Sequence, residues 1–351
     1  MPLQDKRTVV VTSLLFITAL IVRVIGLDLH FLLIDEAFVG VAARDIAFNN
    51  TPMWDAVSNA PYVWGLAQMI GAFGDSPFVL RLPSAIFGAS VSLLIFLFIR
   101  KWAGERAATL SAAIYALHPF ALAFTRVAFV DALQLPAIWM AIFAIDRYLV
   151  VRERKWLITA LLAAALAFIF KYNAIAVIGC WMLIGLVLRR YSIKTSLWLG
   201  AAVLAVSFGT LLLWPFDAPL WFFSFLAKGG SYNGQYIWDF YHYAYRHVTF
   251  GSATLPIALI AYILIRSRLT RDEARRYDHL IIFSIAYFGL LLFLGRPFQR
   301  YLLVLTIPVA IVYSMLIVQG YNAFREWMLS RNARVLVRTA AGLAVLCGVL
   351  I

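Results

Sequence analysis

Residues 8–38 read TVVVTSLLFITALIVRVIGLDLHFLLIDEAF, a long apolar run followed shortly by two adjacent acids, Asp35 and Glu36. The apolar run at residues 8–27 has the length of about 20 residues that an α-helix needs to cross a hydrocarbon core. It is too long for the core of a signal peptide, and no small-residue cleavage motif follows it. We therefore interpret it as a retained membrane span, with two carboxylates placed just beyond it.

The composition of the whole chain indicates a polytopic, all-α membrane protein. Of the 351 residues, 64% are hydrophobic and only 13% are charged, and the mean hydropathy is +0.87. These values exclude a soluble globular domain. The two cysteines, Cys180 and Cys347, both lie in apolar runs, which excludes a disulfide framework and a cysteine-based metal site.

Hydropathy predicts about eleven transmembrane helices. The expected spans are residues 8–27, 82–99, 107–124, 128–146, 157–170, 174–188, 195–213, 251–265, 280–294, 301–319 and 335–351. Residues 1–351 are expected to form a single transmembrane domain, without a soluble C-terminal domain. Two longer segments, 28–81 and 214–250, are expected to form outer loops. The first is expected to carry short interfacial helices, and the second is rich in Trp, Tyr and Phe.

The distribution of basic residues predicts a cytoplasmic N-terminus. With that orientation, 21 of the 30 Lys and Arg residues fall in inner segments. The net charge of +13 is then a signal of topology and a match to anionic lipid, and no RNA- or DNA-binding motif accompanies it. We therefore expect membrane lipids as partners and no nucleic acid.

The acids Asp35 and Glu36 have two interpretations. An ionised carboxylate at the edge of the hydrocarbon layer is costly, so such a residue usually has a partner or a function. Alternatively, the two acids begin a helix, because negative charge is favourable at a helix N-terminus. The residues alone leave both interpretations open.

The order of several motifs resembles that of the GT-C superfamily of membrane glycosyltransferases, in the branch of protein O-mannosyltransferases and the aminoarabinose transferase that acts on lipid A. The matching motifs are Asp35-Glu36-Ala37, Pro61-Tyr62, Phe78 to Ala85, Gly104-Glu105-Arg106, His118-Pro119, Thr125 to Asp131, Phe170-Lys171-Tyr172 and Arg296 to Leu303. Ala60 stands where the aminoarabinose branch has a lysine, which argues against that sugar specificity.

The resemblance implies a GT-C fold and an inverting transfer of a sugar from a polyprenyl phosphate to an acceptor hydroxyl at the outer face of the plasma membrane. The acceptor is a lipid, a glycan or a protein. Asp35 matches the proposed catalytic base of the superfamily, and Glu36 is expected to support it. The alternative class is a polytopic transporter or a flippase for lipid-linked sugars.

Fixed cations near the membrane surface are expected to stabilise the lipid phosphate that leaves. The candidates are Lys171, Arg296 and Arg300, with Tyr301 beside them. For Lys171, snorkelling of the side chain to the interface is the alternative.

Three further residues are expected to support the site. Asp131 either pairs with Arg126 or orients an acceptor, and Arg81 is expected to hold the first outer loop against the helices. No cofactor is required by this chemistry. The histidines lack the spacing of known metal motifs, and His242 is the one weak candidate for a divalent metal.

Overall fold

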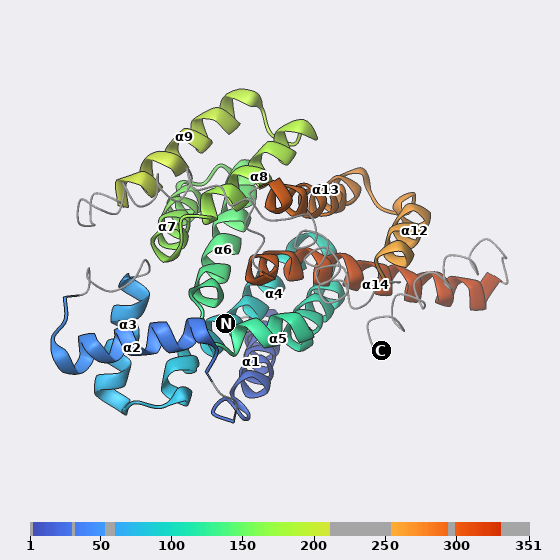
Figure 1. Cartoon of the computed structure of the whole chain (residues 1–351). Helices are drawn as coiled ribbons and strands as arrows, with labels where there is room; N and C mark the ends of the chain where they lie inside the picture. Colours follow the sequence, from blue (N-terminus) through green and yellow to red (C-terminus); the bar gives the residue numbers. More distant parts are fainter. Residues whose placement is uncertain (1–2, 30–31, 53–59, 211–253, 294–298, 331–351) are drawn as a thin grey trace. The chain divides into compact units, whose positions relative to one another are not determined.

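The computed structural model describes residues 3–29, 32–52, 60–210, 254–293 and 299–330, and these form helices and short connections without strands. The N-terminal half contains α1 (Leu3–Val24), α2 (Ile34–Asn49), α3 (Ala60–Phe73), α4 (Pro77–Leu117), α5 (Pro119–Thr125), α6 (Val130–Val151), α7 (Arg154–Phe170), α8 (Ala174–Val187) and α9 (Ile193–Gly209). After a gap come α12 (Thr254–Arg266), α13 (Arg271–Phe293), the 3-10 helix η3 (Gln299–Leu305) and α14 (Thr306–Ser330), as Figure 1 shows. The all-α class expected from the sequence is confirmed.

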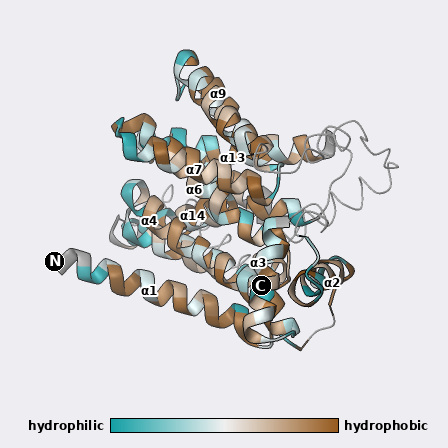
Figure 2. Cartoon of the chain, turned by 90° about the vertical axis from the view of Figure 1, so that its left-hand side faces the viewer, coloured by the Kyte–Doolittle hydropathy of each residue, from teal (hydrophilic) through white to brown (hydrophobic). Residues whose placement is uncertain are grey.

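Four of these helical stretches are long and apolar enough to cross a membrane. Among the described residues they are Lys6–Val24, Pro77–Leu117, Val130–Val151 and Arg300–Glu326. Val10, Leu14, Ile17 and Ile21 of α1 are each about half exposed and recur at helical spacing on one face. The hydrophobic colour accordingly follows most of α1 in Figure 2. Such an uncovered apolar face is expected to contact lipid. With several helices of this kind, the chain is a multi-pass membrane protein.

The helix α4 contains two segments joined at Gly104. This glycine has a φ of 81°, in the left-handed region that favours glycine. The break agrees with the two separate spans predicted around it. The second segment is shorter than expected, because α4 ends at Leu117, before His118-Pro119. A proline lacks the backbone N–H that a helix interior needs and disfavours helical geometry at the residue before it.

The described residues divide into two compact units. One, here called the first unit, draws on residues 1–16, 95–121 and 231–351, and the second unit draws on residues 17–94 and 122–230. In the second unit, α2 packs on α3, and α6 packs on α7. The predicted aromatic loop at 214–250, the span at 335–351 and the candidate residues His242 and Arg296 lie outside the described residues.

A tight approach between Gly185 and Tyr191 stabilises the second unit at the end of α8. A Cβ atom added at Gly185 would lie 2.0 Å from Cε2 of Tyr191. The Tyr191 hydroxyl donates to Asp146, which also pairs with Arg190 at 3.0 Å. The Tyr191 ring is therefore positioned by its hydrogen bond to Asp146 and by its close packing against Gly185.

We expect Gly185→Ala to lower the free energy of unfolding by roughly 1–3 kcal/mol, the usual cost of overpacking. The matched control is Gly179→Ala on the same helix, where nothing lies within 4 Å of the added Cβ. That variant is expected to be neutral or slightly more stable, because alanine favours the helix over glycine. Unfolding of the purified protein in mixed micelles measures both, and equal effects would contradict the close approach.

Candidate active site

The two acids predicted as the centre of the site lie in the first turn of α2. Leu33 precedes the helix in an extended conformation, with φ −67° and ψ 156°. The Glu36 side chain folds back, and its Oε2 atom accepts a hydrogen bond of 2.9 Å from the Leu33 backbone N–H. The helix N-terminus expected as one interpretation of these acids is therefore present, and Glu36 satisfies one of its free N–H groups.

Glu36 is fully buried and is bound by Arg81. The Arg81 guanidinium donates from Nε to Oε1 and from Nη2 to Oε2, both at 2.9 Å. The backbone N–H of Ala128 also donates to Oε1, at 2.7 Å. Such a bidentate pair is geometrically specific and among the stronger interactions in proteins. The charge of Glu36 is thus compensated by a cation and by backbone N–H groups.

Arg81 also joins the end of α1 to this pair. Its Nη1 atom donates to the backbone oxygen of Leu27 at 2.8 Å, and the side chain is 3% exposed. Arg126 acts similarly, donating to the backbone oxygen of Ile25 at 2.6 Å. Together these contacts connect the segment after α1, the start of α2 and the segment before α6. Within the second unit, Arg81 therefore holds the segment after α1 against the start of α2.

Asp35, the neighbour of Glu36, has a different environment. Its side chain is exposed, whereas that of Glu36 is 0% exposed. The adjacent positions point in different directions because successive helical residues are about 100° apart around the axis. The Glu36 carboxylate is therefore buried in the fold, whereas the Asp35 side chain is exposed.

A second buried ion pair lies in the same unit. Lys171 Nζ lies 2.8 Å from Oδ1 and 3.0 Å from Oδ2 of Asp131, with side chains 10% and 7% exposed. The sequence suggested Arg126 as one partner of Asp131. In the structure the partner is Lys171. The sequence suggested phosphate binding or snorkelling for Lys171, and neither anticipated this contact.

Lys171 lies between α7 and α8, and Gln134 forms hydrogen bonds with the residues of this connection. The Gln134 amide nitrogen lies 3.1 Å from the backbone oxygen of Ala167 and 2.8 Å from Oδ1 of Asn173. It also approaches the backbone oxygen of Lys171. Sequence reasoning missed Gln134, although an amide within the apolar run of α6 is a recognisable signal of a polar contact.

The remaining cation candidates belong to the first unit. Arg300 and Tyr301 lie in η3, and the backbone oxygen of Tyr301 accepts a hydrogen bond from the Tyr287 hydroxyl at 3.4 Å. The described ranges contain no cluster of three or more His, Cys, Asp or Glu side chains suited to a metal ion. Whether His242 contributes to a metal site stays a prediction.

Comparisons with known proteins found one family model and solved structures that match this chain. The family model of dolichyl-phosphate-mannose-protein mannosyltransferases matches residues 60–214. The crystal structure of ArnT from Cupriavidus metallidurans bound to undecaprenyl phosphate is similar over 96% of this chain and 69% of that chain, with a TM-score of 0.63 and 18% identity. The chain has the GT-C fold.

The ArnT structure in the apo state is similar to this GT-C chain to the same extent, with 16% identity, a TM-score of 0.62, and coverage of 96% of this chain and 69% of that chain. No curated protein matches the chain. The recognition of the GT-C superfamily from the order of motifs is confirmed. The matching family model describes mannosyltransferases, and both similar structures share the fold of this chain.

Proposed function

We propose that this protein is an inverting glycosyltransferase that moves a sugar from a polyprenyl phosphate to an acceptor hydroxyl at the outer face of the cell membrane. The observation that carries the proposal is the difference between two adjacent acids. Glu36 is fully buried and paired with Arg81, whereas Asp35 is exposed. A general base needs an accessible carboxylate in a fixed position, and this arrangement supplies one. The similar ArnT structure contains undecaprenyl phosphate, which supports the class of donor.

The chemistry assigns one step to each group. Asp35 accepts the proton of the acceptor hydroxyl, whose oxygen attacks the anomeric carbon from the face opposite the phosphate. The bond between the anomeric carbon and the phosphate oxygen breaks, and its electron pair stays on the polyprenyl phosphate. Lys171, Arg296 and Arg300 stabilise the negative charge that grows on that phosphate. Attack from the opposite face inverts the anomeric configuration, and the acceptor is a lipid, a glycan or a protein.

The test of this function is a transfer assay with the purified full chain in nanodiscs. Radiolabelled polyprenyl-phosphate sugars are offered one at a time with candidate acceptors, and the release of polyprenyl phosphate is measured. Release from one donor, with an inverted product, supports the glycosyltransferase. Movement of lipid-linked sugar between leaflets without release from any donor would instead favour the transporter or flippase.

Arg300→Ala tests the phosphate site. A charge-assisted hydrogen bond is worth about 1.5–3 kcal/mol, so we expect roughly 10- to 150-fold weaker binding of undecaprenyl phosphate. Arg325→Ala is the matched control, because Arg325 is an exposed cation on α14 of the same unit. Binding to lipid in nanodiscs measures both variants. Equal affinity of the Arg300→Ala protein and the wild type would remove Arg300 from the phosphate site.

A further inference from the structure

The ion pair between Lys171 and Asp131 creates a problem for the proposed reaction. Both oxygens of Asp131 lie within 3.0 Å of Lys171 Nζ. If Lys171 turns to a donor phosphate, Asp131 remains 93% buried as an ionised group that has lost this cation. Removing a cation from a buried carboxylate is unfavourable. Binding of the donor would therefore be favoured by another group near Asp131 that replaces the lost contact.

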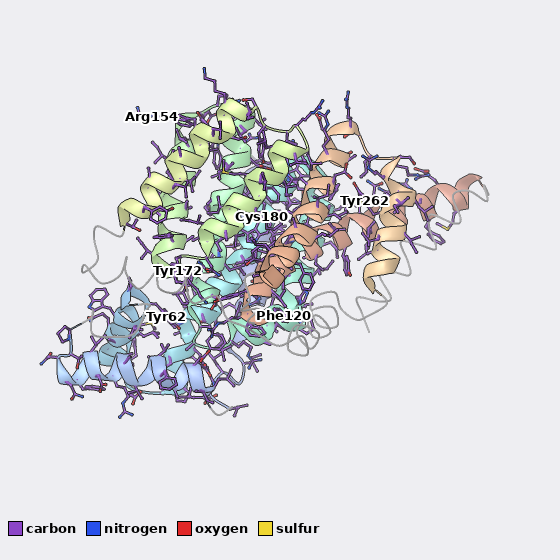
Figure 3. The ribbon with its side chains drawn as sticks, turned by 45° about the horizontal axis from the view of Figure 1, so that its top comes forward. Tyr62, Phe120, Arg154, Tyr172, Cys180 and Tyr262 are labelled. Carbon is purple, nitrogen blue, oxygen red and sulfur yellow. The ribbon has the colours of Figure 1, made fainter. Side chains whose placement is uncertain are left out.

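Tyr62 is the candidate for this group. It lies in the first turn of α3 (Figure 3), and it is 3% exposed. It belongs to a cluster of buried residues that flank the site, including Leu80 next to Arg81, Val130 and Ala132 on either side of Asp131, and Ala128, whose N–H binds Glu36. Phe170, which precedes Lys171, packs against the same cluster.

The Tyr62 hydroxyl is buried, and it has no hydrogen-bond partner among the described residues. Ser84 lies nearby but outside hydrogen-bonding geometry, and its own hydroxyl donates to the backbone oxygen of Phe129 at 3.4 Å. A buried hydroxyl without a partner is unfavourable, and such groups in native proteins call for an explanation.

The acceptor of this hydroxyl is identified by elimination between two acids. Burial raises the pKa of Tyr62 well above its ordinary value, and the nearby charges of Glu36 and Asp131 raise it further against an opposing effect of Ser84. The hydroxyl therefore keeps its proton and acts as a donor. Glu36 already accepts four hydrogen bonds, which fills the roughly four acceptor positions of a carboxylate. Asp131 remains.

We propose that Tyr62 is a positioning residue whose hydroxyl donates to Asp131 when Lys171 turns to the phosphate of the donor, an inference that rests on the proposed function. Tyr62 then keeps Asp131 buried and in place while Lys171 is engaged elsewhere. The hydroxyl that is unsatisfied in the ligand-free protein becomes satisfied in the complex. Removing it must therefore act in opposite directions on the two states.

The test compares wild type with Tyr62→Phe in nanodiscs, with undecaprenyl phosphate as the probe. We expect binding to weaken roughly 10- to 150-fold, as for one hydrogen bond to a charged group. The thermal unfolding midpoint of the ligand-free protein is expected to stay equal or to rise. Tyr313→Phe is the matched control, because Tyr313 is also buried and is not among the residues assigned to the phosphate site. It is expected to bind the probe like wild type.

A second pair of variants tests whether Tyr62 acts through Asp131. In an Asp131→Asn background, adding Tyr62→Phe is expected to change affinity less than about twofold, because a neutral amide does not need the donor. An equal loss in both backgrounds would overturn the proposal and indicate packing alone. A Tyr62→Phe protein that unfolds at lower temperature, or fails to fold, would also overturn it.

Failure of the proposed function itself has a different signature. Lys171→Met is combined with Asp131→Asn, so that no buried charge is left alone, and is compared with Asp131→Asn. Equal affinity for undecaprenyl phosphate in these two proteins would remove Lys171 from the phosphate site. Weaker binding after loss of Lys171, with normal binding by Tyr62→Phe, would reject the role of Tyr62 and leave the function standing.

Discussion

Replacing Glu36 with alanine is expected to lower the free energy of unfolding by about 3–5 kcal/mol, the usual cost of removing one partner of a buried ion pair. The substitution removes the carboxylate that pairs with Arg81, a residue that is only 3% exposed. It also leaves the backbone N–H groups of Leu33 and Ala128 without the acceptor that they have in the native protein. Unfolding of the purified protein by titration with SDS in mixed micelles measures this loss.

The surface pair of Arg44 and Asp75 provides the matched control within the same unit. Its two charges are also 2.9 Å apart, but their side chains are 58% and 30% exposed. Asp75→Ala is expected to cost no more than about 1 kcal/mol, because solvent screens the charges of an exposed pair. The joint replacement Glu36→Gln with Arg81→Met is expected to be milder than Glu36→Ala, since neither charge is left buried alone. A loss below about 1 kcal/mol for Glu36→Ala would contradict the buried clamp.

The sequence predicts those features that depend on local pattern. Apolar runs of sufficient length predicted α1, α6 and α14, and the gap between the predicted spans 82–99 and 107–124 contains the break within α4. The adjacent acids Asp35 and Glu36 were predicted as the centre of the chemistry because carboxylates are rare in such surroundings. These signals need no knowledge of which segments meet in space.

Pairings between distant residues could not be predicted in the same way. Lys171 and Asp131 are 40 residues apart, and Arg81 and Glu36 are 45 residues apart, so no short-range periodicity connects them. Arg126 is nearer to Asp131 in sequence and was the expected partner, yet it binds the backbone at Ile25. Which of the two adjacent acids becomes buried depends on the rotation of α2 against its neighbours. That rotation is set by tertiary packing.

The second large effect is expected for Asp35→Asn, which should lower the rate of sugar transfer by about 10²- to 10⁴-fold, the usual contribution of a general base. The amide keeps the size of the side chain but cannot accept the proton of the acceptor hydroxyl. Because Asp35 is exposed and the buried contacts with Arg81 and the backbone are made by Glu36, the unfolding midpoint and the affinity for undecaprenyl phosphate are expected to stay close to wild type. Rates with saturating donor in nanodiscs measure the effect.

Asp45→Asn separates the role of a base from the effect of charge on α2. Asp45 lies on the same helix, is partly exposed and accepts a hydrogen bond of 3.1 Å from Asn49. Its replacement removes the same charge and is expected to leave the rate of transfer within about twofold of wild type, because exposed charges are well screened. An Asp35→Asn protein that transfers sugar at the wild-type rate would exclude Asp35 as the base. Since Glu36 is enclosed by four hydrogen bonds, the proton acceptor would then have to be a group other than either acid.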